Sequence, residues 1–105
     1  MPAHFEPHHH LRYENQSIRV LEVTLKPGES SLFHTHAHDD VYLTLADAMA
    51  RPQMQGENWG QETKFSLGEA TFDNAAKHPF THRLKNVGTT EFHTLDIEFC
   101  PLEEP

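Results

Sequence analysis

The sequence predicts an all-β fold, a small sandwich or barrel. From Ser17 onward, short stretches of alternating apolar and polar residues are separated by Pro, Gly and Asn, which is typical of such folds. No stretch shows helical periodicity over the roughly 10 to 15 residues that a βαβ unit requires. The length of 105 residues suits one compact domain, which excludes a two-domain cofactor enzyme and a long repeat array.

The first residues are expected to form an arm outside the barrel. They combine Pro2, Pro7 and the run His8-His9-His10 with little apolar periodicity. Three adjacent side chains of a strand cannot all point at one ion, so the run is interpreted as a solvated segment rather than a surface metal site. The predicted organisation is an N-terminal arm over residues 1–16 and a single barrel domain over residues 17–105.

The first strand is expected over residues 18–25, and the segment Lys26-Pro27-Gly28-Glu29 is expected to reverse the chain after it. Pro and Gly residues predict a loop over residues 51–61, and a short helical turn at residues 46–50 is an option before it. The remaining apolar stretches are bounded by turn residues. They predict strands over residues 31–36, 41–46, 62–67, 70–74, 80–84 and 91–100.

The charge of the chain excludes several classes of partner. Eight Lys and Arg against sixteen Asp and Glu give a formal net charge of −8, which disfavours nucleic acid and anionic membrane surfaces. No segment approaches the roughly 20 apolar residues of a membrane span, and the start lacks the apolar region of a secretory signal, so a cytoplasmic location is expected. With Cys100 as the single cysteine, a metal would be held by nitrogen and oxygen.

Ten histidines stand out, and two of them are spaced for a common face. His34 and His36 are separated by one residue in a predicted strand, so both side chains point to the same side of the sheet. Buried imidazoles need partners for both ring nitrogens, and a metal ion satisfies one nitrogen on each ring. Asp40 follows after a short connection, and His82 points inward with Phe80 and Leu84 as neighbours. His82 is therefore either a ligand or a hydrogen-bonded core residue.

These residues resemble the two motifs of the cupin superfamily. Gly28, five residues, His34-Thr35-His36, three residues and an acid match the first motif, G-x5-H-x-H-x3,4-E-x6-G. His82 and Asn86, preceded by Gly68 and Pro79, resemble the end of the second motif, G-x5-P-x-G-x2-H-x3-N. The resemblance implies a double-stranded β-helix, a jelly-roll barrel with a metal inside one end.

The chain departs from these motifs at three positions. Asp40 stands where the family has glutamate and is one methylene shorter. Asp47 occupies the place of the last motif-1 glycine, and Pro79 stands where a glycine is expected in motif 2.

The resemblance implies a site for one divalent transition metal ion. The implied ligands are His34, His36 and His82, with Asp40 as an optional fourth and His38 as a further candidate in the connection. Histidine-only cupins include iron-dependent dioxygenases, and those with an added carboxylate include manganese, nickel and iron enzymes. Nitrogen and oxygen donors suit Fe, Mn, Zn, Ni or Cu, so the ligand set does not select the metal.

Residues beside the ligands are candidates for catalysis. If Asp40 faces the barrel, Tyr42 and Thr44 share that face and offer hydroxyl groups, and Tyr42 or His38 could carry a proton. The alternative is that a bulge reverses this order and turns the Val and Leu residues of the strand inward. His93 is expected to be a hydrogen-bonded core or rim residue rather than a ligand.

The sequence therefore predicts a metalloenzyme acting on a small molecule, by dioxygenase-type or by Lewis-acid lyase or isomerase chemistry. The alternative is a non-catalytic module of the same fold that binds a small ligand or a metal. A homodimer is expected, because a small barrel has sheet edges to cover.

Overall fold

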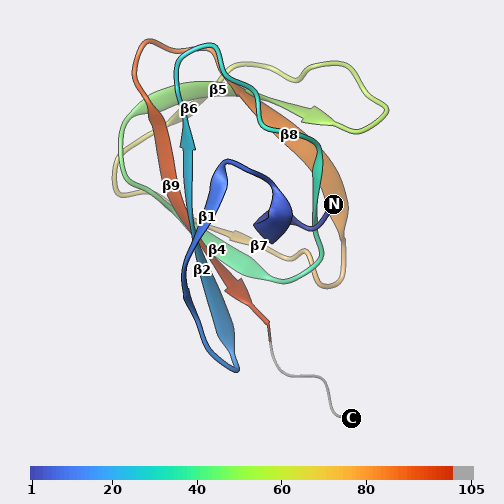
Figure 1. The fold of residues 1–105 in the computed structure, drawn as a ribbon. Coiled ribbons are helices and arrows are strands. Elements are labelled where there is room, and N and C mark those ends of the chain that lie inside the picture. The colour runs from blue at the N-terminus through green and yellow to red at the C-terminus, as the bar shows by residue number, and fades with distance from the viewer. Residues whose placement is uncertain (101–105) are drawn as a thin grey trace.

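The computed structural model describes residues 1–100, and the last five residues of the expected barrel domain lie outside this range. Within it the chain forms one short 3-10 helix and nine strands (Figure 1). The elements in chain order are η1 (Ala3–Phe5), β1 (His9–Glu14), β2 (Ile18–Leu25), β3 (His34–His36), β4 (Asp40–Thr44), β5 (Ala48–Met54), β6 (Thr63–Phe65), β7 (Ala70–Asp73), β8 (Phe80–Asn86) and β9 (Phe92–Phe99). The one helix of this range has three residues, far too few to cross a membrane.

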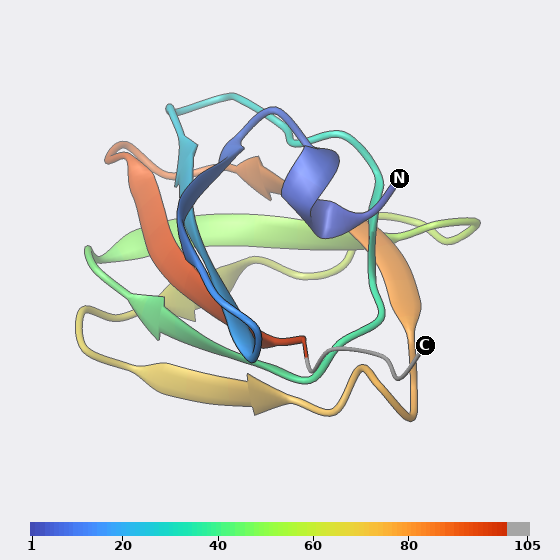
Figure 2. The same ribbon diagram turned by 60° about the horizontal axis from the view of Figure 1, so that its bottom comes forward.

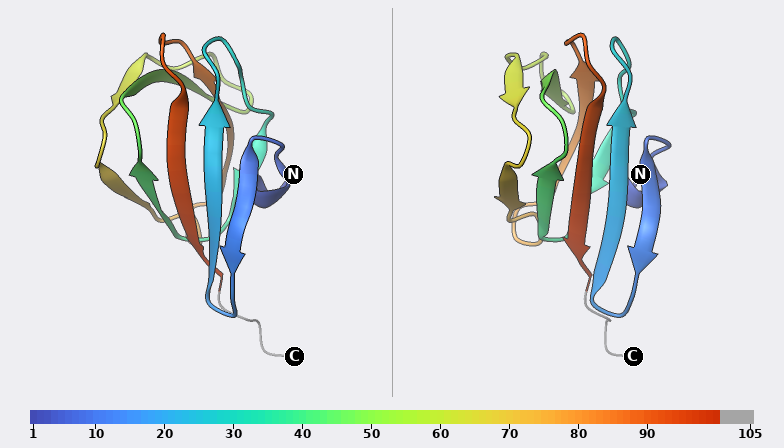
Figure 3. Two further views of the ribbon diagram at one scale, coloured as in Figure 1. Left: turned by 60° about the vertical axis from the view of Figure 1, so that its left-hand side comes forward. Right: turned by 90° about the vertical axis from the view of Figure 1, so that its left-hand side faces the viewer.

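The strands form two antiparallel sheets that face each other as the walls of a barrel (Figure 2). The larger sheet has the order β1-β2-β9-β4-β7, and the smaller one has the order β3-β8-β5-β6. Figure 3 shows the larger sheet with β1 at one edge and β7 at the other. The predicted all-β class is confirmed.

The apolar core fills one end of this barrel. Its buried members come from β2, β5 and β9, and Phe65 and Leu84 pack against them. They are Val23, Leu25, Ala48, Ala50 and Phe92. The other inward positions of β9 are polar, so the barrel interior is not apolar along its whole length.

The optional helical turn at residues 46–50 is wrong, and the loop expected over residues 51–61 begins only after residue 54, because β5 occupies residues 48–54. Ala48 and Ala50 are buried and belong to the apolar core. Pro52 is tolerated because β5 pairs with β6 only as far as Ala50. Beyond that point the missing N–H of Pro52 faces away from β8, and its carbonyl accepts a hydrogen bond from Gly60 instead.

The expectation of a solvated N-terminal segment is also wrong at its centre. Residues 9–14 pair with β2 as the edge strand of the larger sheet, with His9 beside Val23. His9 is buried, and the later residues of β1 are exposed. Polar residues alternate with only two apolar ones, Leu11 and Tyr13, so this strand lacks the usual apolar periodicity.

The two motifs meet in space through backbone and side-chain hydrogen bonds. Gly28 has φ of 86°, a conformation that favours glycine, and its N–H donates to the carbonyl of Asn86 at 2.9 Å. The Asn86 side chain is fully buried and donates to the carbonyls of Leu25 and Thr90 at 2.9 and 2.8 Å. Asn86 therefore holds together the strand ends that frame the core.

Candidate metal centre

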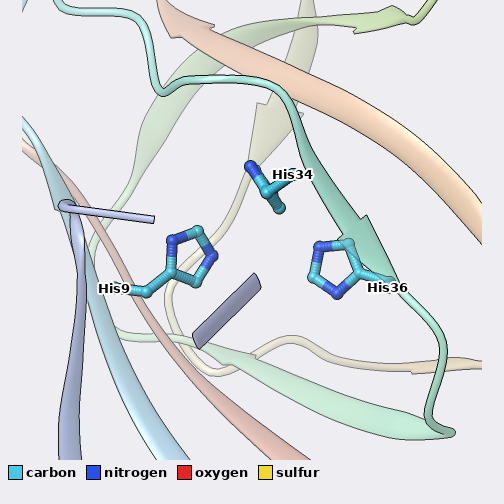
Figure 4. Close-up of side chains that lie close together, drawn as sticks. All are labelled: His9, His34 and His36. Atoms are coloured by element: carbon cyan, nitrogen blue, oxygen red, sulfur yellow. The ribbon is translucent and has the colours of Figure 1, made fainter. Parts of the chain in front are cut away.

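Three buried histidines from two elements converge inside the barrel (Figure 4). His34 and His36 lie on β3 and point to the same side, as strand alternation requires, and His9 enters from the start of β1. One ring nitrogen from each residue lies within 4.8 Å of the corresponding atoms of the other two. This spacing allows one ion to contact all three after small side-chain movements.

His82 lies beside this cluster on β8. It pairs directly with His34 across the two strands, and its ring centroid lies 4.8 Å from that of His34 and 5.0 Å from that of His36. The structure therefore brings together the three histidines that the motifs selected and adds His9 to them. The centroids of the His9 and His34 rings are 4.6 Å apart.

Two of the three rings, His9 and His34, donate a hydrogen bond from Nδ1, and the third, His36, faces a carboxylate. His34 Nδ1 donates to the carbonyl of Leu32 at 2.7 Å, and His9 Nδ1 donates to a carboxylate oxygen of Glu6 at 2.9 Å. His36 Nδ1 faces Asp40 at 3.5 Å, which is too long for a full hydrogen bond. Metal-ligating histidines have this arrangement, because an acceptor at one nitrogen fixes the tautomer and directs the other toward the ion.

Glu6 is the most densely hydrogen-bonded carboxylate near the site. It is 1 % exposed, and it accepts from His9 Nδ1, from His8 Nδ1 at 2.8 Å, from the His8 N–H at 2.6 Å and from the Leu32 N–H at 2.8 Å. Burial alone would raise the pKa of Glu6, but these hydrogen bonds lower it to about 2. Glu6 is therefore an anion at neutral pH, as an acceptor for His9 must be.

Glu6 also connects to His34. Leu32 donates its N–H to Glu6 and accepts from His34 Nδ1 with its carbonyl, so one residue links the carboxylate to a second ring. The orientation of two histidines thus depends on one acidic side chain of the N-terminal segment.

The Asp40 carboxylate lies beside the ring of His36, with 3.5 Å between Oδ2 and Nδ1. Asp40 is 1 % exposed, and it neighbours Asp73 on β7 and Glu98 on β9 in the strand register. Neither Asp40 Oδ1 nor His36 Nδ1 has a hydrogen-bond partner within residues 1–100.

Burial sets the charge state of the rings. Burial, together with the neighbouring histidines, lowers the pKa of His34 to about 4 and that of His82 to about 2. Burial also acts to lower the pKa of His36, but the carboxylates of Asp40 and Asp96 raise it above its usual value. His34 and His82 are therefore neutral at pH 7, which is the form that binds a metal.

A cavity of about 280 Å³ opens beside the cluster and contains all four histidines in its wall. Tyr42 also lines this cavity, and Asp40 and Thr44 share its face of β4. The alternative, in which the Val and Leu residues of this strand face inward, is therefore wrong. Burial raises the pKa of Tyr42 above its usual value. Two acids that sequence reasoning missed complete the polar wall, Asp73 and Asp96, and burial raises their pKa values to about 6 and about 7.

Two other candidates lie away from the cavity. His38 is exposed and borders a separate surface hollow with His4 and Glu98. His93 lies on the outer face of β9, where its Nε2 contacts Glu22 at 2.5 Å, so the expected hydrogen bond is confirmed.

Sequence reasoning missed His9 and Glu6. The one pattern that points to them is a carboxylate three residues before a histidine, which is weak in a segment so rich in histidine. Their pairing depends on η1 turning the chain back toward Leu32, and no periodicity in the sequence indicates that turn.

The architecture can be compared with solved structures. A cupin domain from Bordetella pertussis superposes with a TM-score of 0.76 at 19 % identity, covering 87 % of this chain and 90 % of that one. This chain has the cupin fold. A double-stranded β-helix protein from Klebsiella pneumoniae matches the cupin fold here with a TM-score of 0.68 at 18 % identity, covering 99 % and 80 % of the two chains.

A DMSP lyase from Ruegeria pomeroyi also has the cupin fold, with a TM-score of 0.58 at 20 % identity over 87 % of this chain and 42 % of that one. No family model and no curated protein matches the chain. At these identities the likeness shows the cupin fold alone, and the chemistry must be argued from the residues.

The residues fit a divalent transition metal ion. The donors are imidazole nitrogens, which suit Zn, Fe, Ni, Mn and Cu, and two of the rings, His9 and His34, have a hydrogen-bond acceptor at Nδ1. The unpartnered Nδ1 of His36 and Oδ1 of Asp40 mark a polar site whose hydrogen bonds are incomplete without a further group.

Proposed function

We propose that this protein is a small-molecule metalloenzyme that holds one divalent transition metal ion through His34, His36 and His82, with His9 as a fourth ligand. The observation that supports this most strongly is the hydrogen bond that Nδ1 of His9 and Nδ1 of His34 each donate, because it directs Nε2 of both buried rings toward an ion. Asp40 serves as the outer partner of His36 in this proposal.

A bound divalent ion supplies a Lewis acid that polarises an oxygen or sulfur of the substrate. The chain's own residues bind and position that substrate. The apolar end of the cavity, which includes Leu25 and Phe92, receives its non-reacting part and excludes water. The reacting group then lies beside the histidines.

Proton transfer is assigned to the polar wall. Tyr42 lies beside Asp96 in the strand register, and both line the cavity. The raised pKa of Asp96, about 7, allows its carboxyl group to hold or release a proton near neutral pH. Tyr42 contributes its hydroxyl as a donor to the substrate.

These groups favour lyase or isomerase chemistry, in which a proton is moved, over chemistry without an acid or base. The lyase of R. pomeroyi is a protein of the same fold with activity in this class. Dioxygenase-type chemistry remains the alternative for an iron-loaded protein, because imidazole donors also suit ferrous iron.

The test begins with metal-free protein reconstituted separately with Fe, Mn, Zn, Ni and Cu ions. Each form is assayed for turnover of β-substituted and carbonyl compounds, and the ferrous form for oxygen uptake with thiols and dicarbonyls. Turnover that disappears in His36→Ala supports the proposal. Metal binding without turnover of any compound would instead favour the non-catalytic module, and failure to bind any of the ions would contradict the metal site itself.

A further inference from the structure

The cavity changes from apolar to acidic along β9. The residues of this strand that line the cavity follow the order Phe92, Thr94, Asp96. Phe92 lies beside Leu25 and belongs to the apolar cluster, whereas Asp96 lies beside Tyr42 at the polar end. A ligand in the cavity therefore meets two different environments.

The histidine cluster lies between these two ends. Leu84, two residues beyond His82 on β8, packs against the apolar cluster. His36, two residues beyond His34 on β3, faces Asp40. A molecule bound at the histidines thus has the apolar cluster on one side, and on the other side it has carboxylates together with Phe80, whose ring lies 5.0 Å from that of His36.

The charges of the cavity wall are all negative apart from the histidines. Asp73 and Asp96 line the cavity, and none of its lining residues, which all lie within residues 1–100, is Lys or Arg. When they are ionised, the carboxyl groups of Asp40, Asp73 and Asp96 offset the charge of a divalent ion at the histidines. An anionic ligand would therefore gain little from the ion and would face buried carboxylates with no protein cation as a partner.

From this arrangement we propose that the cavity selects small uncharged molecules with an apolar part and rejects analogues that carry a carboxylate or phosphate. This inference rests on the metal site of the proposed function, and it names the class of substrate that the site would take. The apolar part lies against Leu25, Leu84 and Phe92, and the metal-binding group lies at the histidines.

The experiment uses Co²⁺-loaded protein and its visible absorption. The cobalt spectrum is first recorded without a ligand, which tests the metal site by itself. Two probes are then titrated at a pH where both rings are uncharged: 4-methylimidazole, and imidazole-4-acetate, which differs by a carboxylate. The expected result is that 4-methylimidazole binds at least about tenfold more tightly.

Two variants separate the cavity charge from the net charge of the protein. Asp73→Asn removes a carboxylate from the cavity wall and is expected to reduce the discrimination by about tenfold. Glu62→Gln makes the same change in net charge at an exposed position and is expected to leave it unchanged.

Equal or tighter binding of imidazole-4-acetate to the wild-type protein would overturn the inference while leaving the metal site intact. Loss of discrimination in Glu62→Gln as large as in Asp73→Asn would also overturn it, because the cavity wall would then not be its source. If protein treated with Co²⁺ shows no absorption bands of bound cobalt, the metal site is contradicted. The proposed selectivity, which depends on that site, is then contradicted as well.

Discussion

Glu6 and His9 form a carboxylate–imidazole pair inside the barrel, with 2.9 Å between Oε1 and Nδ1. Glu6 precedes β1 and His9 is the first residue of that strand, and both are buried. The pair gives the N-terminal segment a direct part in the candidate metal centre. The Glu6 carboxylate also accepts a hydrogen bond from the N–H of Leu32, and the carbonyl of Leu32 accepts one from His34 Nδ1.

Replacing Glu6 by Gln is expected to weaken metal binding by about 10- to 100-fold. The amide is uncharged and no longer supports His9 as a strong acceptor, so the ring loses both its orientation and part of its basicity. Competitive titration against a chelating dye measures the affinity. Glu62→Gln, at an exposed position, is the matched control and should bind as the wild type does. Equal affinities for both variants would show that Glu6 does not position a ligand.

His82→Ala is expected to lose most of the bound metal, whereas His93→Ala should retain it. The His82 ring lies 4.8 Å from the His34 ring, but His93 lies on the outer face of β9 and contacts Glu22. Metal content per chain after gel filtration gives the comparison. If the His93 variant loses metal and the His82 variant retains it, the second motif has been assigned to the wrong histidine.

The metal-free protein should lose stability as the pH falls below about 6.5, in part because of His82. Burial lowers the pKa of His82 from 6.5 to about 2, so in this range the unfolded chain binds a proton that the folded chain does not. Because of this group, the free energy of unfolding falls by up to about 1.4 kcal/mol for each unit by which the pH drops below 6.5. Above pH 6.5 His82 is neutral in both states, so no stability is lost there.

Urea unfolding of the wild type and of His82→Asn between neutral pH and about pH 4.5 isolates this contribution from those of the acids. The variant should lose less stability than the wild type over the same range. Two curves that run parallel would mean that His82 titrates normally in the folded protein.

Asn86→Ala should lower the free energy of unfolding by about 2 to 4 kcal/mol. The side chain is fully buried, donates to two carbonyls and accepts the N–H of Gly88 at 3.0 Å, so its removal leaves buried backbone groups unpaired. Chemical denaturation of the metal-free protein measures the change. Asn74→Ala, at an exposed position, is the control, and an equal effect of both substitutions would contradict the role assigned to Asn86.

Strand alternation and motif spacing were enough to predict much of the fold and part of the site. β2 has the predicted bounds, residues 18–25, because its apolar residues alternate cleanly between flanking turns. His34 and His36 share a face for the same local reason, and the second motif placed His82 opposite them. These features depend on short stretches of sequence.

The features that sequence reasoning missed depend on contacts between distant segments. His9 reaches the site only because Glu6 is fixed by the N–H of Leu32, 26 residues away. Asp96 belongs to the buried face of β9, which is mostly polar. The opposite face of the strand carries more apolar residues, so the sequence alone favours that face as the inward one. Pro52 argued against a strand at β5 because proline has no N–H to donate to a neighbouring strand. At this position no donor is needed, since the pairing of β5 with β6 ends at Ala50.

Elemental analysis of protein purified without an affinity tag tests the metal centre most directly. Four histidine rings held together inside the barrel predict about one equivalent of a transition metal per chain, or the same amount after reconstitution of metal-free protein. Less than about a tenth of an equivalent of every transition metal, with none regained on reconstitution, would contradict the account.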